Sequence, residues 1–298
     1  MKDRIKVLKK ERNAIILAHN YEPPEIQDIA DLCGDSLELS IKAADTDADV
    51  IVFCGVHFMA ETASILSPDK KVLLPVKDAG CPMADMITPE KLKTRLAELG
   101  DLPVVTYVNS SAAVKAISTI CCTSANVLSV VNSISAPEIL MTPDRNLAMY
   151  AASKTNKKIH LWEGYCPFHN ALTVQEVENV KKAYPEAEFI AHPECPPEIV
   201  AMADAVLSTS GMLRYAASSK NREFIIGTEV GLLYPLKKTC PDKIFYPASL
   251  RMECPEMKKI KIEDILVSLE NMSGEVKVPE EIRIPALRSV QAMVDLSK

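Results

Sequence analysis

Three cysteines recur at similar intervals along this sequence. Cys81, Cys166 and Cys254 are 85 and 88 residues apart, and each is followed directly by a proline. These intervals are far too long for a short metal-binding motif such as CxxC. Thiolates are common ligands of iron–sulfur clusters, and three of them meeting at one point would suit a cluster with one iron left without a cysteine ligand. Whether that chemistry is available depends on whether the fold brings the three thiols together.

Polar triplets recur with the same period as the cysteines. They are His19–Tyr21, Tyr107–Asn109 and His192–Glu194, and each follows a short apolar run. The first and third residues of such a triplet project from the same face of an extended chain. In open parallel sheets, ligands bind beyond the carboxyl ends of the strands. The triplets are therefore predicted to face one polar pocket beside the cysteines.

A hydroxyl residue follows each triplet at a fixed distance. Ser36, Ser124 and Thr209 each lie 17 residues after the first residue of the preceding triplet. All three are predicted at the start of a helix, where free backbone N–H groups favour a carboxylate or a phosphate. A plain helix cap is the competing interpretation, and Ser36 in particular is predicted as the N-cap of a helix over Leu37–Ala44.

Each of these residues also has an ordinary structural explanation. A single histidine is more often a hydrogen-bonded core residue than a ligand, and Tyr21 or Tyr107 could simply pack with a bonded hydroxyl. Asn109 could belong to a turn. The three cysteines could be small buried residues, as we expect for the other six in the chain. The register shared by three copies favours the functional interpretation over each of these.

The elements that must position these residues form a threefold internal repeat. In each copy, short apolar runs typical of buried parallel strands alternate with helical stretches. Such alternation predicts parallel sheets with helices on both faces. We therefore predict an α/β fold of three pseudo-equivalent three-layer αβα lobes around a pseudo-threefold axis. The predicted lobes are residues 1–82 with 256–298, residues 83–168 and residues 169–255.

Composition argues against several classes of partner. The net charge is −6 and only 5% of the residues are aromatic, which is unlike the basic, stacking surface of a nucleic-acid-binding protein. No stretch reaches the roughly 18 consecutive apolar residues of a membrane span, and the charged N-terminus lacks a secretory segment. Nine cysteines, an odd number, are better explained by bound metal than by disulfides. We expect a cytoplasmic protein without a membrane or nucleic-acid partner.

Several longer motifs carry a resemblance to a known family. They are Leu17–Ser40 (LAHNYEPPEIQDIADLCGDSLELS), Gly55–Thr62 (GVHFMAET), Tyr107–Ala112 (YVNSSA), Cys122–Asn126 (CTSAN), Pro143–Leu147 (PDRNL), Glu163–His169 (EGYCPFH), His192–Cys195 (HPEC) and Gly227–Glu229 (GTE). Together these motifs are highly specific, although no single one of them is. The chain resembles the quinolinate synthases over nearly its whole length.

The resemblance implies a cofactor and a reaction. The cofactor would be a [4Fe–4S] cluster held by Cys81, Cys166 and Cys254, with its fourth iron open to substrate. The reaction would condense iminoaspartate with dihydroxyacetone phosphate, losing phosphate and two waters, to give quinolinate for NAD biosynthesis. An enzyme that produces the unstable iminoaspartate would be a candidate transient partner. Some family members have several closely spaced cysteines near the C-terminus, whereas this chain has one, so no local CxxC redox pair is expected.

The resemblance also implies which residues bind the substrates. The family's substrate-binding positions map onto His19, Ser36, Tyr107, Val108, Asn109, Ser124, His192, Pro193, Glu194 and Thr209.

Proton carriers are needed for dehydration and tautomerisation. The predicted catalytic residues are Glu194 first and Tyr21 second, together with His19 and Tyr107. His169, three residues after a cluster cysteine, has two open interpretations, a supporting contact or a catalytic role. Three further polar residues either line the same cleft or only cap helices, namely Glu61, Asn146 and Glu229.

Two other functions stay open on the sequence alone. An open-iron cluster could serve a different hydro-lyase acting on another polycarboxylate. A non-enzymatic alternative is a metal-storage or sensor protein, or a small-molecule binder with structural Zn²⁺. Structural zinc normally takes four protein ligands, and three equivalent cysteines fit that number poorly. The colour of an anaerobically purified sample separates these cases, because iron–sulfur protein is brown and zinc protein is colourless.

Overall fold

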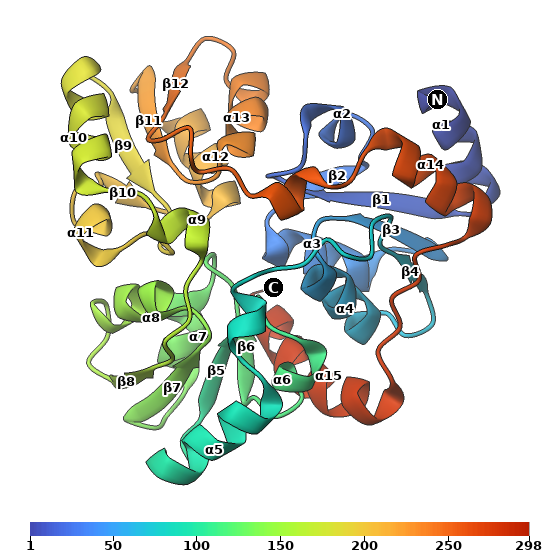
Figure 1. The fold of residues 1–298 in the computed structure, drawn as a ribbon, viewed down its shortest axis with the longest axis horizontal. Coiled ribbons are helices and arrows are strands. Elements are labelled where there is room, and N and C mark those ends of the chain that lie inside the picture. Colours follow the sequence, from blue (N-terminus) through green and yellow to red (C-terminus); the bar gives the residue numbers. More distant parts are fainter. Residues whose placement is uncertain (298) are drawn as a thin grey trace.

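Three parallel sheets make up the fold. The structure is a computed structural model that describes residues 1–297. Each sheet has four strands and the same strand order, in which the second strand of the lobe forms one edge and the fourth forms the other. The three lobes are arranged around a common centre (Figure 1). The predicted α/β fold of three αβα lobes is confirmed.

The first lobe is built on the sheet β2–β1–β3–β4. Its two central strands are continuous apolar runs that pair in parallel, with Ala14 opposite Val50 and Ala18 opposite Cys54. Such runs suit strands that are covered on both faces. The elements of this lobe are α1 (Lys2–Glu11), β1 (Ala14–His19), α2 (Pro24–Gln27), β2 (Leu32–Gly34), α3 (Ser36–Asp45), β3 (Val50–Cys54), α4 (His57–Leu66) and β4 (Lys71–Leu73).

The second and third lobes repeat this plan. The elements of the second lobe are α5 (Pro89–Leu99), β5 (Val104–Tyr107), α6 (Ala112–Lys115), β6 (Ile120–Cys122), α7 (Val127–Ser133), β7 (Glu138–Thr142), α8 (Arg145–Ala152) and β8 (Lys158–Leu161). Those of the third are α9 (Pro167–Asn170), α10 (Val174–Ala183), β9 (Glu188–Ala191), α11 (Pro197–Val200), β10 (Ala205–Val206), α12 (Thr209–Ser218), β11 (Glu223–Gly227), α13 (Leu233–Thr239) and β12 (Ile244–Pro247).

Local sequence explains why equivalent helices begin where they do. The four-residue helices α2 and α11 both start in the sequence Pro-Pro-Glu-Ile, with a proline at the first helical position. Proline is favoured there because its missing N–H would have no partner inside the helix. The short edge strands β2, β6 and β10 were not predicted, because two or three residues are too few to show a periodic pattern.

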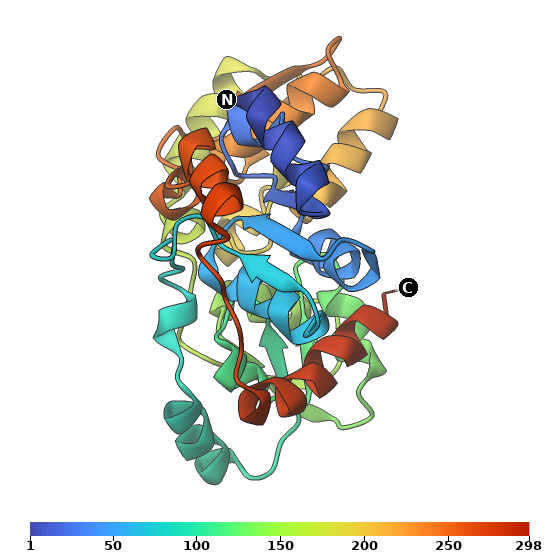
Figure 2. The same ribbon diagram turned by 90° about the vertical axis from the view of Figure 1, so that its right-hand side faces the viewer.

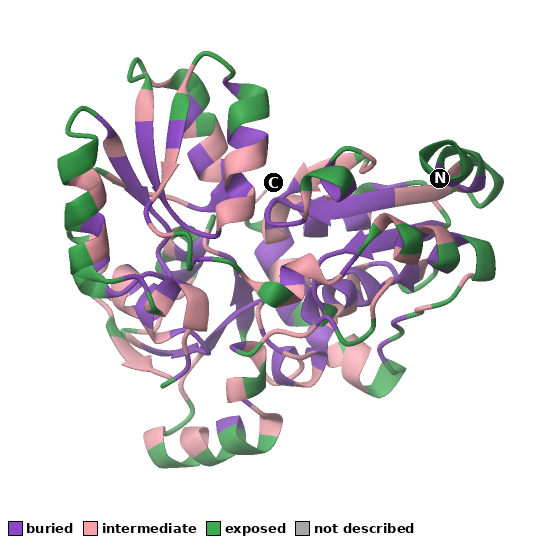
Figure 3. Cartoon of the chain, turned by 45° about the horizontal axis from the view of Figure 1, so that its top comes forward, coloured by how far each residue is buried: buried purple, intermediate pink, exposed green. Residues whose placement is uncertain are grey.

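The last two helices tie the lobes together. Helix α14 (Ile262–Asn271) packs against α1, whereas α15 (Glu280–Asp295) packs against α4 of the first lobe and against α6 and β6 of the second (Figure 2). Buried residues are concentrated in the strands and at the centre, and outer helices such as α5 are largely exposed (Figure 3). Among the described residues, no helix combines the length and apolar character needed to cross a membrane.

Candidate active site and metal centre

One cavity takes residues from all three lobes. It lies at the carboxyl ends of the central strands, since His19 ends β1, Tyr107 ends β5 and His192 directly follows β9. Of the predicted substrate-binding residues, Val108 and Pro193 do not line it, because the middle member of a triplet projects from the opposite face of the extended chain. The predicted residues that do line it are His19, Tyr21, Ser36, Tyr107, Asn109, Ser124, His192, Glu194, Thr209, Cys81, Cys166 and Cys254.

The three cysteines enter this cavity one from each lobe's last loop. All three are half-buried and none forms a disulfide. Burial raises the pKa of each thiol, to about 12 for Cys81, to about 11 for Cys254, and well above the ordinary value for Cys166. Without a metal the thiols are therefore protonated at neutral pH, and binding a metal would displace the protons.

The same local structure presents each thiol. A short helical turn begins one to three residues after each cysteine, at Ala84–Met86, Pro167–Asn170 and Pro255–Lys258. Each cysteine sulfur accepts hydrogen bonds from backbone N–H groups two or three residues after that cysteine, and these bonds lower the pKa of the thiol, against the effect of burial. The N–H groups belong to Met83, Ala84, His169, Glu256 and Met257. N–H donors of this kind stabilise a thiolate.

Two buried carboxylates hold the backbone of two of the cysteines. Asp144 Oδ2 accepts the N–H of Cys166 at 3.3 Å, and Glu229 Oε1 accepts the N–H of Cys254 at 3.2 Å. Both side chains are only 1% exposed. Glu229 also lines the cleft, which was one of the two roles open to it from the sequence. Asp144 was not predicted, and its place in the PDRNL motif was the only signal for it.

Glu194 is a buried carboxylate of the cavity with three side-chain neighbours. Its Oε1 accepts the hydroxyl proton of Tyr107 at 2.6 Å, and its Oε2 lies 2.8 Å from His169 Nδ1 and 3.7 Å from His192 Nδ1. Burial alone would raise its pKa, but the two histidines and the hydrogen bonds from His169 and Tyr107 hold the pKa of Glu194 well below its ordinary value. Glu194 is therefore ionised at neutral pH and can act as a base.

A chain of side chains leads from Glu194 to Tyr21. His169 bonds Glu194 through Nδ1, and its Nε2 lies 2.8 Å from Thr228 Oγ1. Thr228 Oγ1 in turn lies 2.5 Å from the hydroxyl of Tyr21, whose pKa is raised by burial and by nearby carboxylates. This glutamate–histidine–threonine–tyrosine relay joins residues of the first and third lobes. Thr228 was not predicted, although the GTE motif contains it.

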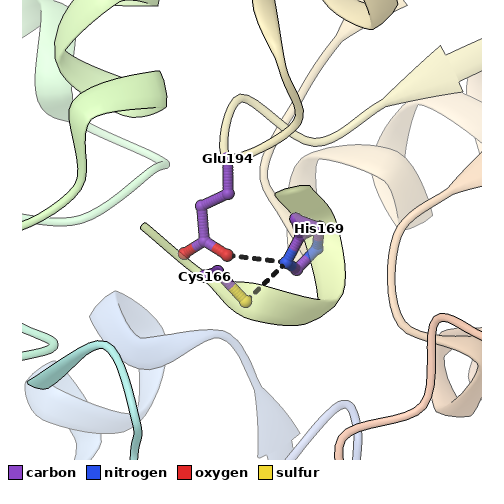
Figure 4. Close-up of side chains that lie close together, drawn as sticks. All are labelled: Cys166, His169 and Glu194. Carbon is purple, nitrogen blue, oxygen red and sulfur yellow. Dashed lines mark hydrogen bonds and ion pairs between the residues drawn. The ribbon is translucent and has the colours of Figure 1, made fainter. Parts of the chain in front are cut away.

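His169 also reaches the metal centre. Its Nδ1 lies 3.1 Å from Cys166 Sγ, and the ligand atoms of Cys166, His169 and Glu194 all lie within 4.8 Å of one another (Figure 4). These three residues could hold a metal ion. His169 is thus in contact both with a cysteine of the metal centre and with the predicted base.

None of the three hydroxyl residues caps a helix, and the prediction that Ser124 lies at the start of a helix was wrong, because α7 begins only at Val127. The prediction that Ser36 caps its helix was wrong by one residue, because Asp35 accepts the N–H groups of Leu37 and Glu38, and helix α3 begins at Ser36. Ser208, and not Thr209, likewise caps α12.

Two of these hydroxyls have side-chain partners in another lobe. Ser124 lies 3.1 Å from His192 Nε2, and Thr209 accepts from Asn20 Nδ2 at 3.1 Å. Asn20 is the middle residue of its triplet, and its role between lobes was not predicted. Contacts of this kind couple the pocket hydroxyls of one lobe to the strand ends of the next.

Comparison with known proteins assigns the family. The family of quinolinate synthetase A proteins matches residues 3–295. The chain belongs to this family. It is 58% identical over 298 residues to a quinolinate synthase of Geobacter sp. (strain M21), covering 100% of this chain and 98% of that protein. It is 54% identical over 291 residues to quinolinate synthase 1 of Methanosarcina acetivorans, covering 98% of this chain and 96% of that protein.

A member of the quinolinate synthetase A family is expected from the resemblance to bind an iron–sulfur cluster, and the residues present fit one. Three free cysteines line a single cavity, and each sulfur receives backbone N–H groups from a helical turn. Asn109 Oδ1 is buried and has no hydrogen-bond partner among the described residues, so the cavity also contains an acceptor available to a ligand.

The electrostatics of the cavity distinguish this site from a cluster of basic side chains. Burial, with a contribution from Lys258, lowers the pKa of His19 to about 3, and burial lowers that of His192 to about 3. Both histidines are neutral at pH 7. Among the described residues that line the cavity, none is a lysine or an arginine. A bound anion would therefore rely on backbone N–H groups, hydroxyls, neutral histidines and metal.

Two polar residues left open by the sequence lie outside the cavity lining. Asn146 donates to the backbone carbonyl of Glu194 at 2.9 Å and to Asn170 Oδ1 at 3.1 Å, so it supports the loop that carries the predicted base. Glu61 Oε2 accepts the N–H of Ala112 at 2.9 Å, which joins α4 to the start of α6. Asn146 supports the site indirectly, and Glu61 caps a helix of the next lobe.

Proposed function

We propose that this chain is a quinolinate synthase. It would act as a transferase that condenses iminoaspartate with dihydroxyacetone phosphate, releasing phosphate and two waters, in the biosynthesis of NAD. The observation that supports this most is the convergence of Cys81, Cys166 and Cys254 on one cavity that is also lined by Glu194 and Tyr21, the two ends of the relay. The names of its relatives, at 53–58% identity over nearly the full length, agree with it.

The proposed cofactor is a [4Fe–4S] cluster. Cys81, Cys166 and Cys254 would hold it through their thiolates, one from each lobe. When bound, a cluster with one iron lacking a cysteine ligand supplies a Lewis acid for a substrate oxygen. His169 and Glu194, which lie beside Cys166, would face that position.

Substrate anions would be held by the hydroxyl residues of the cavity. Ser36 and Thr209 are the first residues of the ten-residue helices α3 and α12, and their hydroxyls are not used for capping. The helix dipole favours a carboxylate or phosphate near such a position, and the hydroxyl of the first residue could donate a hydrogen bond to it. Asn109 would accept a hydrogen bond from a substrate hydroxyl or nitrogen through its unpaired Oδ1.

Proton transfers would be carried out by Glu194 and the relay. Glu194, ionised and buried, would take a proton from the substrate carbon or nitrogen, with Tyr107 and His169 holding its two oxygens. Tyr21, whose raised pKa keeps its hydroxyl protonated, would donate a proton to a leaving hydroxyl. His169 Nε2 and Thr228 Oγ1 can then return a proton to Tyr21 without opening the site to water.

The setting of the reaction follows from substrate chemistry. Iminoaspartate hydrolyses readily, so a transient contact with the enzyme that produces it would limit loss of the substrate. We further propose a cytoplasmic location, because all nine cysteines are free and three of them would have to remain reduced to bind iron.

Iron and sulfide analysis of anaerobically purified protein, with an absorption spectrum, tests the cofactor. The reaction is tested by supplying iminoaspartate and dihydroxyacetone phosphate separately and together, because quinolinate is expected only when both are present. A brown protein that instead dehydrates another polycarboxylate would be a different hydro-lyase. A colourless protein that contains zinc would contradict the proposal.

A further inference from the structure

The loop that carries Cys81 shares one backbone attachment with the other two cysteine loops but differs from them in its side-chain contacts. In all three lobes a backbone N–H just after the third strand donates to the carbonyl two residues before the cysteine. These bonds are His57 to Ala79 at 2.8 Å, Arg145 to Gly164 at 2.8 Å and Val230 to Met252 at 2.8 Å. The three loops are therefore equivalent in their backbone attachment.

The side chain just before each donor breaks this equivalence. Asp144 and Glu229 precede their donors and accept the N–H of Cys166 and Cys254. The residue in the same place in the first lobe is Val56, which has no acceptor. Cys81 therefore lacks the carboxylate that its own lobe would be expected to provide.

A carboxylate from the turn that follows Cys254 takes its place. Glu256 Oε2 accepts the N–H of Gly80, the residue before Cys81, at 2.7 Å. Glu256 is also the second residue after Cys254, and its own backbone N–H lowers the pKa of the Cys254 thiol. A single residue thus contacts both cysteine loops, one through its side chain and the other through its backbone.

Neighbouring contacts keep Glu256 in this position. Lys259 Nζ lies 2.8 Å from Glu256 Oε2 and donates to the carbonyl of Asp78 at 2.7 Å. On the other side of the same turn, Lys258 donates to the carbonyl of Tyr21 and pairs with Glu229 at 2.9 Å. The turn Pro255–Lys258 is therefore attached to the first lobe both beside Cys81 and beside the relay.

The first cysteine loop also has open space behind it. Gly80 and Cys81 line the central cavity and, in addition, a surface groove that includes His57, Lys77 and Asp85. A loop with open space on two sides has fewer packing contacts to hold it in place. A charge-assisted hydrogen bond of 2.7 Å to a carboxylate that is 20% exposed supplies the missing constraint.

We propose that Glu256 is a positioning residue for the metal centre, clasping the Cys81 loop of the first lobe to the Cys254 loop of the third. The clasp sets the separation of the Cys81 and Cys254 thiolates. This inference rests on the proposed function, because it requires a metal cluster. Lys259 contributes less than the Gly80 bond, because exposed ion pairs are weak. Its pairing partner Asp78 is 82% exposed.

The test uses the full chain with its cluster, under anaerobic conditions, and measures the rate at which excess bathophenanthroline removes iron. Glu256→Ala is expected to lose iron at least fivefold faster than the unmodified protein. Glu256→Gln keeps an oxygen for the Gly80 N–H and is expected to stay within twofold. Lys259→Met should fall between them. Glu253→Gln, an exposed carboxylate one residue before Cys254, is the matched control and should release iron at the unmodified rate.

A second measurement separates position from charge. Glu256→Gln and Glu256→Ala each remove one negative charge near the cluster, so both should shift its midpoint potential to more positive values. Only Glu256→Ala should also accelerate iron release. The thermal midpoint of the metal-free protein should change little in both variants, which excludes general unfolding as the cause.

The outcomes distinguish this inference from the proposed function. Iron release from Glu256→Ala at the unmodified rate would overturn the clasp while leaving the cluster in place. Equal acceleration in Glu256→Ala and Glu256→Gln would show that the charge, and not the hydrogen bond, matters, and would also overturn it. A wild-type protein without iron and sulfide would instead overturn the proposed function.

Discussion

Tyr21 and Glu194 occupy equivalent places in two lobes and have opposite properties. Each is the third residue of a polar triplet that follows a central strand, β1 for Tyr21 and β9 for Glu194. Burial and nearby carboxylates raise the pKa of Tyr21, whereas histidines and hydrogen bonds hold the pKa of Glu194 low despite its burial. One position therefore carries a proton at neutral pH and the other does not.

The comparison shows how a repeated scaffold becomes an asymmetric site. The repeat sets where the side chains start, but their neighbours decide their protonation. His169 lies between the two residues, bonded to Glu194 on one side and through Thr228 to Tyr21 on the other. A donor and an acceptor joined in this way are what a reaction with several proton transfers requires. Substitutions of Glu194, of Tyr21 or of Thr228, which connects Tyr21 to His169, test this division of roles.

The largest effect on turnover is expected from loss of the proposed cluster, because Glu194 and Tyr21 would both act on substrate bound there. Cys166→Ser removes one of three thiolates, and we expect loss of the cluster and of turnover to background, with most of the fold retained. Cys33→Ser is the matched control, because Cys33 is also half-buried and free but does not line the cavity. Iron analysis, absorbance and thermal unfolding are the measurements. Normal cluster absorbance in Cys166→Ser would contradict the ligand assignment.

The next largest effect is expected at the base. Glu194→Gln keeps the shape of the side chain but removes its charge, so turnover should fall by about 10²–10⁴-fold, the range of general base catalysis. The absorption spectrum of the cluster should be unchanged. Steady-state quinolinate formation measures the first and absorbance the second. Turnover within a few-fold of the unmodified enzyme would reject proton transfer by Glu194.

A smaller effect is expected at the connection. Thr228→Val removes the hydroxyl between His169 and Tyr21, and we expect about a tenfold loss of turnover, with Thr228→Ser restoring most of it. Tyr21→Phe should lower turnover more, by about 10²-fold. If the relay acts as a unit, the double variant should be no slower than Tyr21→Phe alone. Multiplicative losses in the double variant would show that the two residues act independently.

The smallest expected effect is on the pH dependence of stability, to which the neutral, buried His192 contributes. The pKa of His192 is lowered to about 3 in the folded protein, so the unfolded chain binds more protons between about pH 6.5 and 3. Stability of the metal-free protein should therefore fall as the pH drops below about 6.5. His192→Asn should reduce this dependence by at most about 1.4 kcal/mol per pH unit. Urea unfolding of both proteins at pH 7 and pH 5.5 measures this pH dependence. If the unfolding free energy of His192→Asn changes with pH as much as that of the unmodified protein, the result would contradict a neutral, buried His192.

The fold was largely predictable because its signals are local and repeated. Apolar runs such as Ala14–Ala18 and Val50–Cys54 predict buried strands, and their alternation with helices predicts three αβα lobes. The edge strands β2, β6 and β10 were missed, since they exist only through pairing with a neighbour. The cap of α3 was misplaced by one residue because Asp35 and Ser36 are both good caps, and only the backbone geometry selects between them.

The candidate site divides in the same way. Residue types and spacing alone singled out the three cysteines, the triplets and the hydroxyls, and all of these line one cavity except the middle residues of the triplets, Asn20, Val108 and Pro193. Thr228 and Asp144 were missed, as was the contact of Asn20 with Thr209, because each matters through a partner that is distant in sequence or in another loop. Glu256 is the clearest case, since its partner Gly80 is 176 residues away in the chain.

By itself, then, the order of amino acids determined the threefold repeat, the lobe architecture and the set of reactive side chains, because these depend on local pattern. Which carboxylate is ionised, which hydroxyl is left free and which lobe supports which cysteine were decided only in the tertiary structure. The reason is physical. Protonation and hydrogen bonding depend on burial and on the neighbours that folding places within a few ångströms, and neither is written in the spacing of residues along the chain.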